Sequence, residues 1–151
     1  MWMPSFTTRQ FGRIDYEEAA VIEFPLGLPA FEAERRFLAV ERPATSPIVF
    51  FQSLSNPDLC FTALPVRIVE PAYEPMACPE DLEAVGIREG HMLAEGGIGV
   101  FALLTCPPGG PATANLLAPV LVNPEARKAV QAVRTDRRYS HQQPIGGAPC
   151  S

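Results

Sequence analysis

Residues that could act as nucleophiles, bases or metal ligands are few in this sequence and lie far apart. His91 and His141 are its two histidines, and neither has a second ligand at the spacing of a zinc site. No G-x-S-x-G sequence surrounds a serine, so the strained turn that exposes the nucleophile of many hydrolases is missing. Ser53, His91 and Asp58 would form a nucleophilic set only if the fold assembled them. We therefore expect no catalytic residue, no metal site and no cofactor.

The four cysteines also lack the spacing of a reactive or metal-binding group. Cys60, Cys78, Cys106 and Cys150 are widely separated and include no C-x-x-C pair. Cys60 and Cys106 lie in apolar runs, where desolvation keeps a thiol protonated and unreactive. Free thiols favour a reducing compartment, and the chain has neither a signal-peptide run nor the ~20 consecutive apolar residues that span a bilayer. We expect a cytoplasmic protein without a membrane partner.

Charge is unevenly distributed along the chain and favours protein partners. Residues 1–124 carry seven basic and fifteen acidic side chains, a net of −8, whereas residues 125–151 carry a net of +3. An acidic surface repels phosphate groups, so we expect no direct binding of nucleic acid over most of the molecule. Such a surface attracts basic proteins, although solubility alone also accounts for it. The glycine-rich residues 96–99 do not change this expectation, because they precede a strand-like run and do not open a helix.

Proline and glycine divide the chain into short elements that must position any binding residues. Together they make up about 19% of the chain, against roughly 12% on average, which favours strands and turns over a helical bundle. A short helix is predicted at residues 79–85, with Pro79 in its first turn and Gly86 at its end. Residues 126–133 fit a helix or a returning strand equally well. Strands are predicted at residues 6–14, 19–24, 36–41, 48–54, 59–64, 66–69, 97–106 and 113–122, the first with a bend or bulge at Phe11-Gly12 and the last interrupted at Pro119.

Two polar segments supply the candidate partner-binding residues. The turn at residues 55–58 is predicted to join two strands in a hairpin, and recognition residues concentrate on such loops, although Asn and Asp also cap their own turns. Acidic residues on the predicted helix could meet a basic partner or form only a solvated face. The six candidates are Gln52, Asn56, Asp58, Glu80, Asp81 and Glu83. Phe61 and Tyr73 could act as aromatic anchors if they are exposed.

Three further sequence segments, in order, carry a family resemblance. Phe11-Gly12 is followed by I-E-F-P-L-G-L-P-A-F-E at residues 22–32, residues 51–61 read F-Q-S-L-S-N-P-D-L-C-F, and residues 113–123 read T-A-N-L-L-A-P-V-L-V-N. They are similar to F-G … G-L-P-G-F-E, L-Q-S-x-x-x-P-D-L-A-F and T-A-N-L-L-A-P-I-V-I-N of the FliW family of flagellar assembly factors. The resemblance covers residues 6–141, where Tyr139-Ser140 is similar to the family's ending.

The resemblance has local departures and leaves most motif residues with structural roles. Residue 30 is alanine where the family usually has glycine, so we expect that turn to differ in shape. The alanine-rich residues 126–133 replace a more strand-like segment of the family. Gly27, Pro29 and Phe31 are expected in a turn and in the core rather than at a contact. Asn115 is expected to bond the backbone from a buried position.

The resemblance implies a mostly β fold, namely a small, barrel-like antiparallel β domain with one or two short helices. We place this domain at residues 1–141 and a flexible tail at residues 142–151. FliW-like proteins bind the RNA-binding translational repressor CsrA, which relieves its repression of flagellin synthesis. They also bind flagellin as a chaperone-like partner, and flagellin that is not exported thereby releases CsrA. An acidic domain suits a basic partner such as CsrA, with steering that weakens as salt rises.

Two alternative functions stay open at this point. A secretion chaperone would bind flagellin and not CsrA. A small β-barrel hydrolase or ligand-binding protein would need a deep polar pocket with His91 beside a carboxylate, and a filled barrel interior would exclude it.

Overall fold

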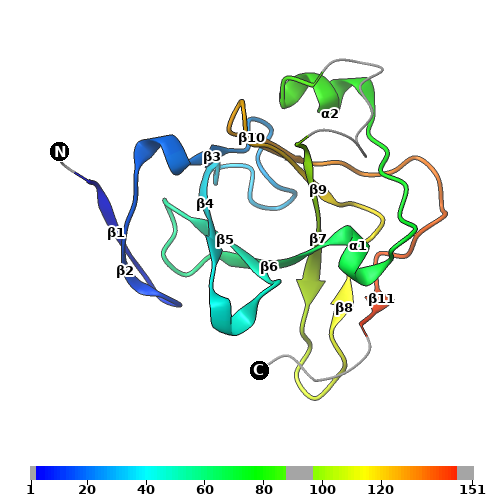
Figure 1. Cartoon of the computed structure of the whole chain (residues 1–151), viewed down its shortest axis with the longest axis horizontal. Helices are drawn as coiled ribbons and strands as arrows, with labels where there is room; N and C mark the ends of the chain where they lie inside the picture. The colour runs from blue at the N-terminus through cyan, green and yellow to red at the C-terminus, as the bar shows by residue number, and fades with distance from the viewer. Residues whose placement is uncertain (1–2, 88–96, 146–151) are drawn as a thin grey trace.

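In the part of the chain that the structure describes, residues 3–87 and 97–145, seven strands close into a β-barrel (Figure 1). The structure is a computed structural model. The order around the barrel is β7-β6-β5-β4-β3-β10-β9, and β9 pairs back with β7, so the predicted barrel-like β fold is confirmed. The strands are β3 (Ile22–Glu23), β4 (Arg36–Glu41), β5 (Val49–Ser53), β6 (Cys60–Pro65), β7 (Gly99–Thr105), β9 (Val120–Asn123) and β10 (Lys128–Gln131).

The barrel closes where β7 pairs with β9. Its junction between β3 and β10, which we call the seam, has little backbone pairing. Residues 99–101 of β7 pair in register with residues 120–122 of β9. Neighbouring barrel strands run antiparallel except β3 and β10, which run parallel and pair only at Glu23 and Lys128. The hydrogen bond from Glu23 N to Arg127 O, 2.9 Å long, crosses this β3–β10 seam. The seam therefore has the least backbone pairing of any junction in the barrel.

Apolar side chains from every barrel strand fill the interior. One cluster joins Phe24, Phe37, Phe51 and Val120 with half-buried residues such as Phe101. The rings of Phe24 and Phe37 meet edge to face at 5.0 Å between centroids, and those of Phe51 and Phe101 at 5.7 Å. Such pairs contribute about 0.5–1.5 kcal/mol each beyond the burial of area. The interior is thus a packed core, as in other small barrels.

The remaining elements cover the outside of the barrel. A hairpin of β1 (Ser5–Thr8) and β2 (Gly12–Asp15) packs against Val21, Leu38 and Leu54. Helix α2 (Pro79–Ala84) packs against β10 and shares a cluster with Leu121 and Val130. Strand β8 (Thr113–Ala114) extends the sheet from β7, and β11 (Gln143–Pro144) pairs with β8. The short helical turns are α1 (Val66–Val69), η1 (Glu18–Ala20) and η2 (Pro43–Thr45).

Turn chemistry explains which sequence predictions are confirmed. Strands β5 and β6 form the predicted hairpin, and α2 has Pro79 in its first turn and Gly86 after its end at φ 74°. Glycine reaches this left-handed conformation without steric cost, so it can end a helix. The alternative of a strand within residues 126–133 is the one the structure adopts, as β10.

Four strand predictions differ from the structure for local reasons. The prediction at residues 19–24 is confirmed only for β3, because residues 18–20 form the turn η1. Residues 6–14 form two strands instead of one, because Gly12 at φ 67° begins the return strand of a hairpin. Residues 66–69 form one helical turn, closed by a hydrogen bond from Glu70 N to Val66 O, since so short an apolar run has no diagnostic period. The predicted interruption of residues 113–122 is confirmed but begins earlier than Pro119, because the Asn115 side chain accepts hydrogen bonds from the backbone of residues 117 and 118.

The loop between β3 and β4 contains two residues in the left-handed region. Gly27 has φ 68°, and a Cβ at this position would lie 2.6 Å from the backbone of Glu32, so only glycine fits. Ala30 has φ 70°, which is a conformation that favours glycine. Alanine at residue 30 therefore carries backbone strain.

Replacing this alanine should stabilise the fold. Ala30→Gly should raise the free energy of unfolding by about 1 kcal/mol, because relief of left-handed strain exceeds the extra freedom of the unfolded chain. Urea denaturation of both proteins measures the difference. Gly27→Ala is the matched control and should lower stability through both its φ and its steric contact. An Ala30→Gly midpoint at or below that of the unchanged protein would contradict the prediction.

Candidate protein-binding surfaces

The turn between β5 and β6 exposes one of the predicted carboxylates. The Asn56 side-chain oxygen accepts the Asp58 N–H at 3.0 Å, and Leu59 N donates to Asn56 O at 3.1 Å. Asn56 thus caps its own turn and is half-buried, while Asp58 is exposed. We call Asn56 and Asp58 the turn surface.

Gln52 does not lie on the turn surface. Its side chain is 0% exposed, and its Nε2 donates to Ser53 O at 3.0 Å and to Leu59 O at 3.1 Å. Its Oε1 has no hydrogen-bond partner among the described residues. The prediction that Gln52 lies at the surface is therefore wrong. All five residues of β5 are buried, so the position just before the turn is still inside the protein.

A carboxylate joins the turn surface to the loop before β4. Glu34 accepts a hydrogen bond from the buried Ser53 hydroxyl at 3.1 Å and another from the Ser55 hydroxyl. The Ser53 oxygen also accepts the Asn56 N–H at 2.9 Å. Ser53 thus has a structural role in fixing the turn. The third member of the hypothetical nucleophilic set, His91, lies outside the described residues.

Helix α2 presents the other three predicted acidic residues. Glu80 and Glu83 are exposed, and Asp81 is half-buried with its carboxylate 3.2 Å from the Cys78 thiol, which donates to it. The opposite face of the helix is anchored by Leu82, which packs in the cluster over β9 and β10. The helix therefore exposes Glu80 and Glu83 on a base that Leu82 anchors, while Asp81 lies partly against Cys78. We call Glu80, Asp81 and Glu83 the helix surface.

The two acidic surfaces lie on different sides of the barrel. Strands β4 and β3 separate β5 from β10 in one direction, and β6 and β7 separate β5 from β9 in the other. Figure 1 shows α2 at the top of the view, away from β5. The predicted partner-binding residues therefore form two separate surfaces. A small, continuous contact with one partner would not cover both.

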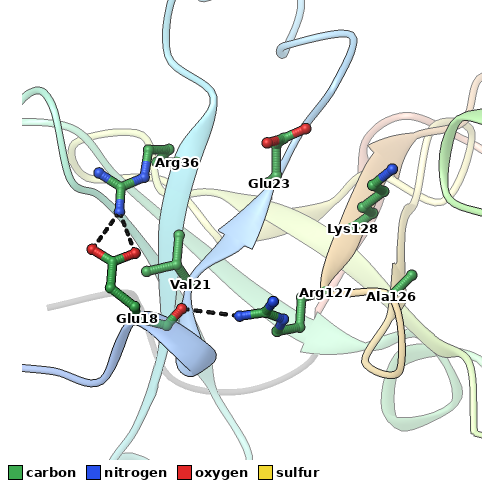
Figure 2. A pocket seen from close by; sticks show the side chains of 7 residues that line it. All are labelled: Glu18, Val21, Glu23, Arg36, Ala126, Arg127 and Lys128. Carbon is green, nitrogen blue, oxygen red and sulfur yellow. Dashed lines mark hydrogen bonds and ion pairs between the residues drawn. The ribbon is translucent and has the colours of Figure 1, made fainter.

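A third charged site, which the sequence analysis missed, is a pocket of 270 Å³ at the β3–β10 seam. Figure 2 shows Arg36 directed at Glu18, where one guanidinium nitrogen contacts both carboxylate oxygens at 2.8 and 3.0 Å. Arg127 donates to the backbone oxygen of Glu18 at 3.1 Å. Lys128 and Glu23 lie side by side as register partners. Three basic side chains line this pocket beside two acidic ones, and the contact of Arg127 with Glu18 ties the N-terminal segment to the residue before β10 across the seam.

The basic C-terminal segment folds back onto the barrel through Arg134. Its side chain is 1% exposed, and it binds both oxygens of Asp136, at 2.8 and 2.9 Å. The guanidinium carbon lies 5.2 Å from the ring centre of Tyr73 and 4.6 Å from that of Tyr139, within the range of cation–π attraction. The hydrogen bond from Arg134 lowers the pKa of Asp136. Part of the positive charge of this segment is therefore neutralised within the protein.

Tyr73 is a core residue and does not provide an exposed anchor. It is 1% exposed, and its hydroxyl donates to Leu116 O at 2.7 Å. Burial raises the pKa of this hydroxyl, whereas its hydrogen bond with Arg134 acts in the opposite direction. The contact of Tyr73 with Arg134 joins positions 61 residues apart, so no local sequence pattern could have indicated it.

The described cysteines differ in their state. Cys60 and Cys78 are free thiols, and burial raises the pKa of Cys60 to about 11. Cys106 is exposed and disulfide-bonded, so the expectation of a buried free thiol is wrong at this position. The reason is that β7 ends at Thr105, and residue 106 follows the apolar strand.

Within the described ranges, the possible metal ligands do not gather into a site. No group of three or more histidine, cysteine, aspartate or glutamate side chains is placed to hold a metal ion there. His141 is exposed in a turn before β11. The longest described helix, α2, has six residues, and none in these ranges could cross a membrane. The geometry described so far offers charged outer surfaces around a packed core.

Comparison with known proteins gives one consistent family. The sequence model of the FliW protein family matches residues 5–145. The flagellar assembly factor FliW of Syntrophomonas wolfei subsp. wolfei is 32% identical over 135 residues, which cover 89% of this chain and 83% of that protein. The protein of the same name from Caldanaerobacter subterraneus subsp. tengcongensis is 30% identical over 141 residues, 91% of this chain and 90% of that one. A crystal structure of the flagellar assembly factor FliW aligns with a TM-score of 0.81 and 26% identity, over 93% of this chain and 96% of that chain.

The raised pKa of Cys60 leads to a labelling prediction. In the folded protein at pH 8, iodoacetamide should alkylate Cys60 roughly a hundredfold more slowly than in urea, because the thiolate is scarce until the pH approaches about 11. Mass spectrometry of proteolytic peptides measures the rate at this residue. Equal rates in buffer and in urea would show that the thiol is not desolvated and would reopen a nucleophilic role.

Proposed function

Because the chain belongs to the FliW family of flagellar assembly factors, we propose that it binds the translational repressor CsrA and relieves its repression of flagellin synthesis. It also binds flagellin as a chaperone-like partner. Flagellin that has not been exported then takes the protein away from CsrA, which becomes free to repress. In this proposal the protein acts in the cytoplasm, through binding alone and without a cofactor.

The observation that supports a basic partner most directly is the outward acidic face of α2. Glu80, Asp81 and Glu83 lie within one short helix whose apolar side is fixed in the core, so their charges are held in place. The formal net charge of the whole chain is −5. Fixed charges of one sign speed the association of an oppositely charged protein and help to orient it. We propose the helix surface as the contact for CsrA, with the turn surface as the second candidate contact.

The packed interior argues against the alternative of a barrel hydrolase or ligand-binding protein. Such a protein would need an internal polar pocket, whereas apolar residues from all seven strands fill the described interior. The relatives are named as assembly factors and not as enzymes. We therefore propose that the chain has no enzymatic activity.

A chaperone that binds flagellin and not CsrA is the remaining alternative, since the same surfaces could serve it. A pull-down from lysate of the source bacterium separates the two proposals. Recovery of flagellin together with CsrA supports the switch, and recovery of flagellin alone supports the chaperone.

Neutralising the helix surface should weaken binding to CsrA. The triple variant Glu80→Gln, Asp81→Asn, Glu83→Gln should bind purified CsrA about tenfold more weakly at low salt, with a smaller difference at high salt. Calorimetric titration measures the affinity, and thermal unfolding checks the fold.

A matched control changes the same number of charges elsewhere. The variant Glu17→Gln, Glu41→Gln, Glu125→Gln alters three exposed carboxylates and should stay within about twofold of the unchanged protein. Equal losses in both variants would indicate only a general charge effect. No loss in the helix variant, together with a loss in Asp58→Asn, would move the contact to the turn surface.

The switch also predicts competition between the two partners. Adding purified flagellin to a preformed complex of this chain with CsrA should lower the amount of CsrA that stays bound, in proportion to the flagellin added. Size-exclusion chromatography with quantification of each protein measures the exchange. A stable complex of all three proteins, with CsrA undiminished, would contradict the proposed release.

A further inference from the structure

The loop between β3 and β4 exposes two large apolar side chains. Leu26 is 54% exposed and Phe31 is 39% exposed, whereas Leu28 between them is 2% exposed and packs in the barrel core. The sequence analysis assigned Phe31 to a turn and to the core. Only the turn is confirmed, because Phe31 N donates to Leu28 O at 2.8 Å while a large part of the ring faces solvent.

Backbone hydrogen bonds within the loop fix its conformation and therefore the positions of Leu26 and Phe31. Gly27 N donates to Phe24 O at 2.9 Å, and Glu34 N donates to Phe31 O at 3.0 Å. Gly27 also packs directly against the backbone of Glu32. Leu26 precedes Gly27 and Phe31 precedes Glu32, so this contact brings Leu26 and Phe31 to the same part of the loop. A preorganised loop loses little conformational entropy when a partner binds.

The ring of Phe31 packs against aromatic residues of the barrel. Its ring meets that of Phe61 edge to face at 5.6 Å, and Phe61 in turn lies 6.1 Å from Phe37 inside the barrel. Phe61 is half-buried. An aromatic ring that is packed on one side and open on the other is typical of the residues that contribute most to a protein interface.

Three carboxylates lie on the loop and the turn that carry this apolar group. Glu32 follows Phe31 directly, and Glu34 joins the loop to the turn surface through its hydrogen bond from Ser55. Asp58 is exposed on that turn, three residues before Phe61. Arg35 is the basic residue of the same loop, and its Nε donates to the backbone oxygen of Glu32 at 3.3 Å. Arg9 reaches the same turn, where its backbone N–H donates to Pro57 O at 3.0 Å, so three carboxylates stand against two arginines on these segments.

We propose that Leu26, Phe31 and Phe61 form the apolar centre of a docking surface for a protein segment with one large apolar side chain between lysine or arginine residues. The apolar side chain packs beside Phe31, and the flanking cations face Glu32 and Asp58. This inference rests on the proposed function only in that the partner is a protein. It holds whether or not that partner is CsrA or flagellin.

A peptide titration tests the surface independently of those two proteins. The probe is a synthetic peptide with a single leucine between lysines, and its matched control carries glutamates in place of the lysines. At low salt the lysine peptide should shift the amide NMR signals of residues 26–34 and 56–61 in the full chain. It should bind at least about tenfold more tightly than the glutamate peptide. Equal affinities, or shifts that map elsewhere, would overturn the proposal.

Variants separate the docking surface from general apolar exposure. Leu26→Ser with Phe31→Ser should weaken binding of the lysine peptide by about tenfold, which is the loss expected for an interface anchor. The control pair, Ile68→Ser with Val133→Ser, removes apolar side chains that are 59% and 54% exposed and should bind as before. Leu26→Ser alone leaves the Phe31–Phe61 contact in place, so it should still fold and should lose part of the affinity. Unchanged binding by the folded Leu26→Ser and double variants would refute the assignment.

The same variants, titrated with CsrA and with flagellin, distinguish the two proposals. If the unchanged protein binds neither of them, the proposed function fails while the peptide result still decides the docking surface. If both bind but the lysine peptide does not, the docking surface fails and the proposed function stands.

Discussion

Closure of the sheet between β7 and β9 is the constraint on which the rest of the structure depends. Once residues 99–101 pair with residues 120–122, each barrel strand has neighbours on both sides and one face turned inward. Apolar side chains from the barrel strands then pack into one core cluster, with a single seam of weak pairing at β3 and β10. The charged side chains that a protein partner could contact lie outside this cluster.

Several cations on the outside of the barrel are paired with carboxylates. Arg134 binds Asp136 and is covered by two tyrosines, and Arg138 contacts Glu74 at 2.9 Å. Arg36 is paired with Glu18 at the seam. The two exposed pairs, Arg36 with Glu18 and Arg138 with Glu74, add little to stability, and each neutralises one carboxylate together with one cation. Pairing therefore leaves the net charge unchanged, and among the described residues Asp58, Glu80 and Glu83 take part in none of these ion pairs.

Turns and helix ends, which depend on neighbouring residues, could be predicted from the sequence, whereas contacts between distant residues could not. The turn at residues 55–58 and the helix start at Pro79 follow from residues next to each other, so both predictions are confirmed. Burial of Gln52 depends on how other strands cover β5, and the pairing of Arg134 with Tyr73 depends on the path of the intervening chain. The exposure of Phe31 is likewise set by how the β3–β4 loop rests on Phe61. The positions of the elements were thus more predictable than the surfaces they form.

The arrangement of the surfaces restricts how one protein can exchange two partners. The hydrogen bond of Ser55 to Glu34 links the β3–β4 loop to the turn that carries the turn surface, whereas the helix surface lies across the barrel. Coupling between separate faces requires an element with two arrangements, and a close-packed core resists gradual deformation. In the proposed switch, direct competition therefore favours partners that overlap on one face. Two partners would overlap if each contacted both the turn surface and the apolar side chains of the β3–β4 loop. The charges would speed association, and the buried apolar area would slow dissociation.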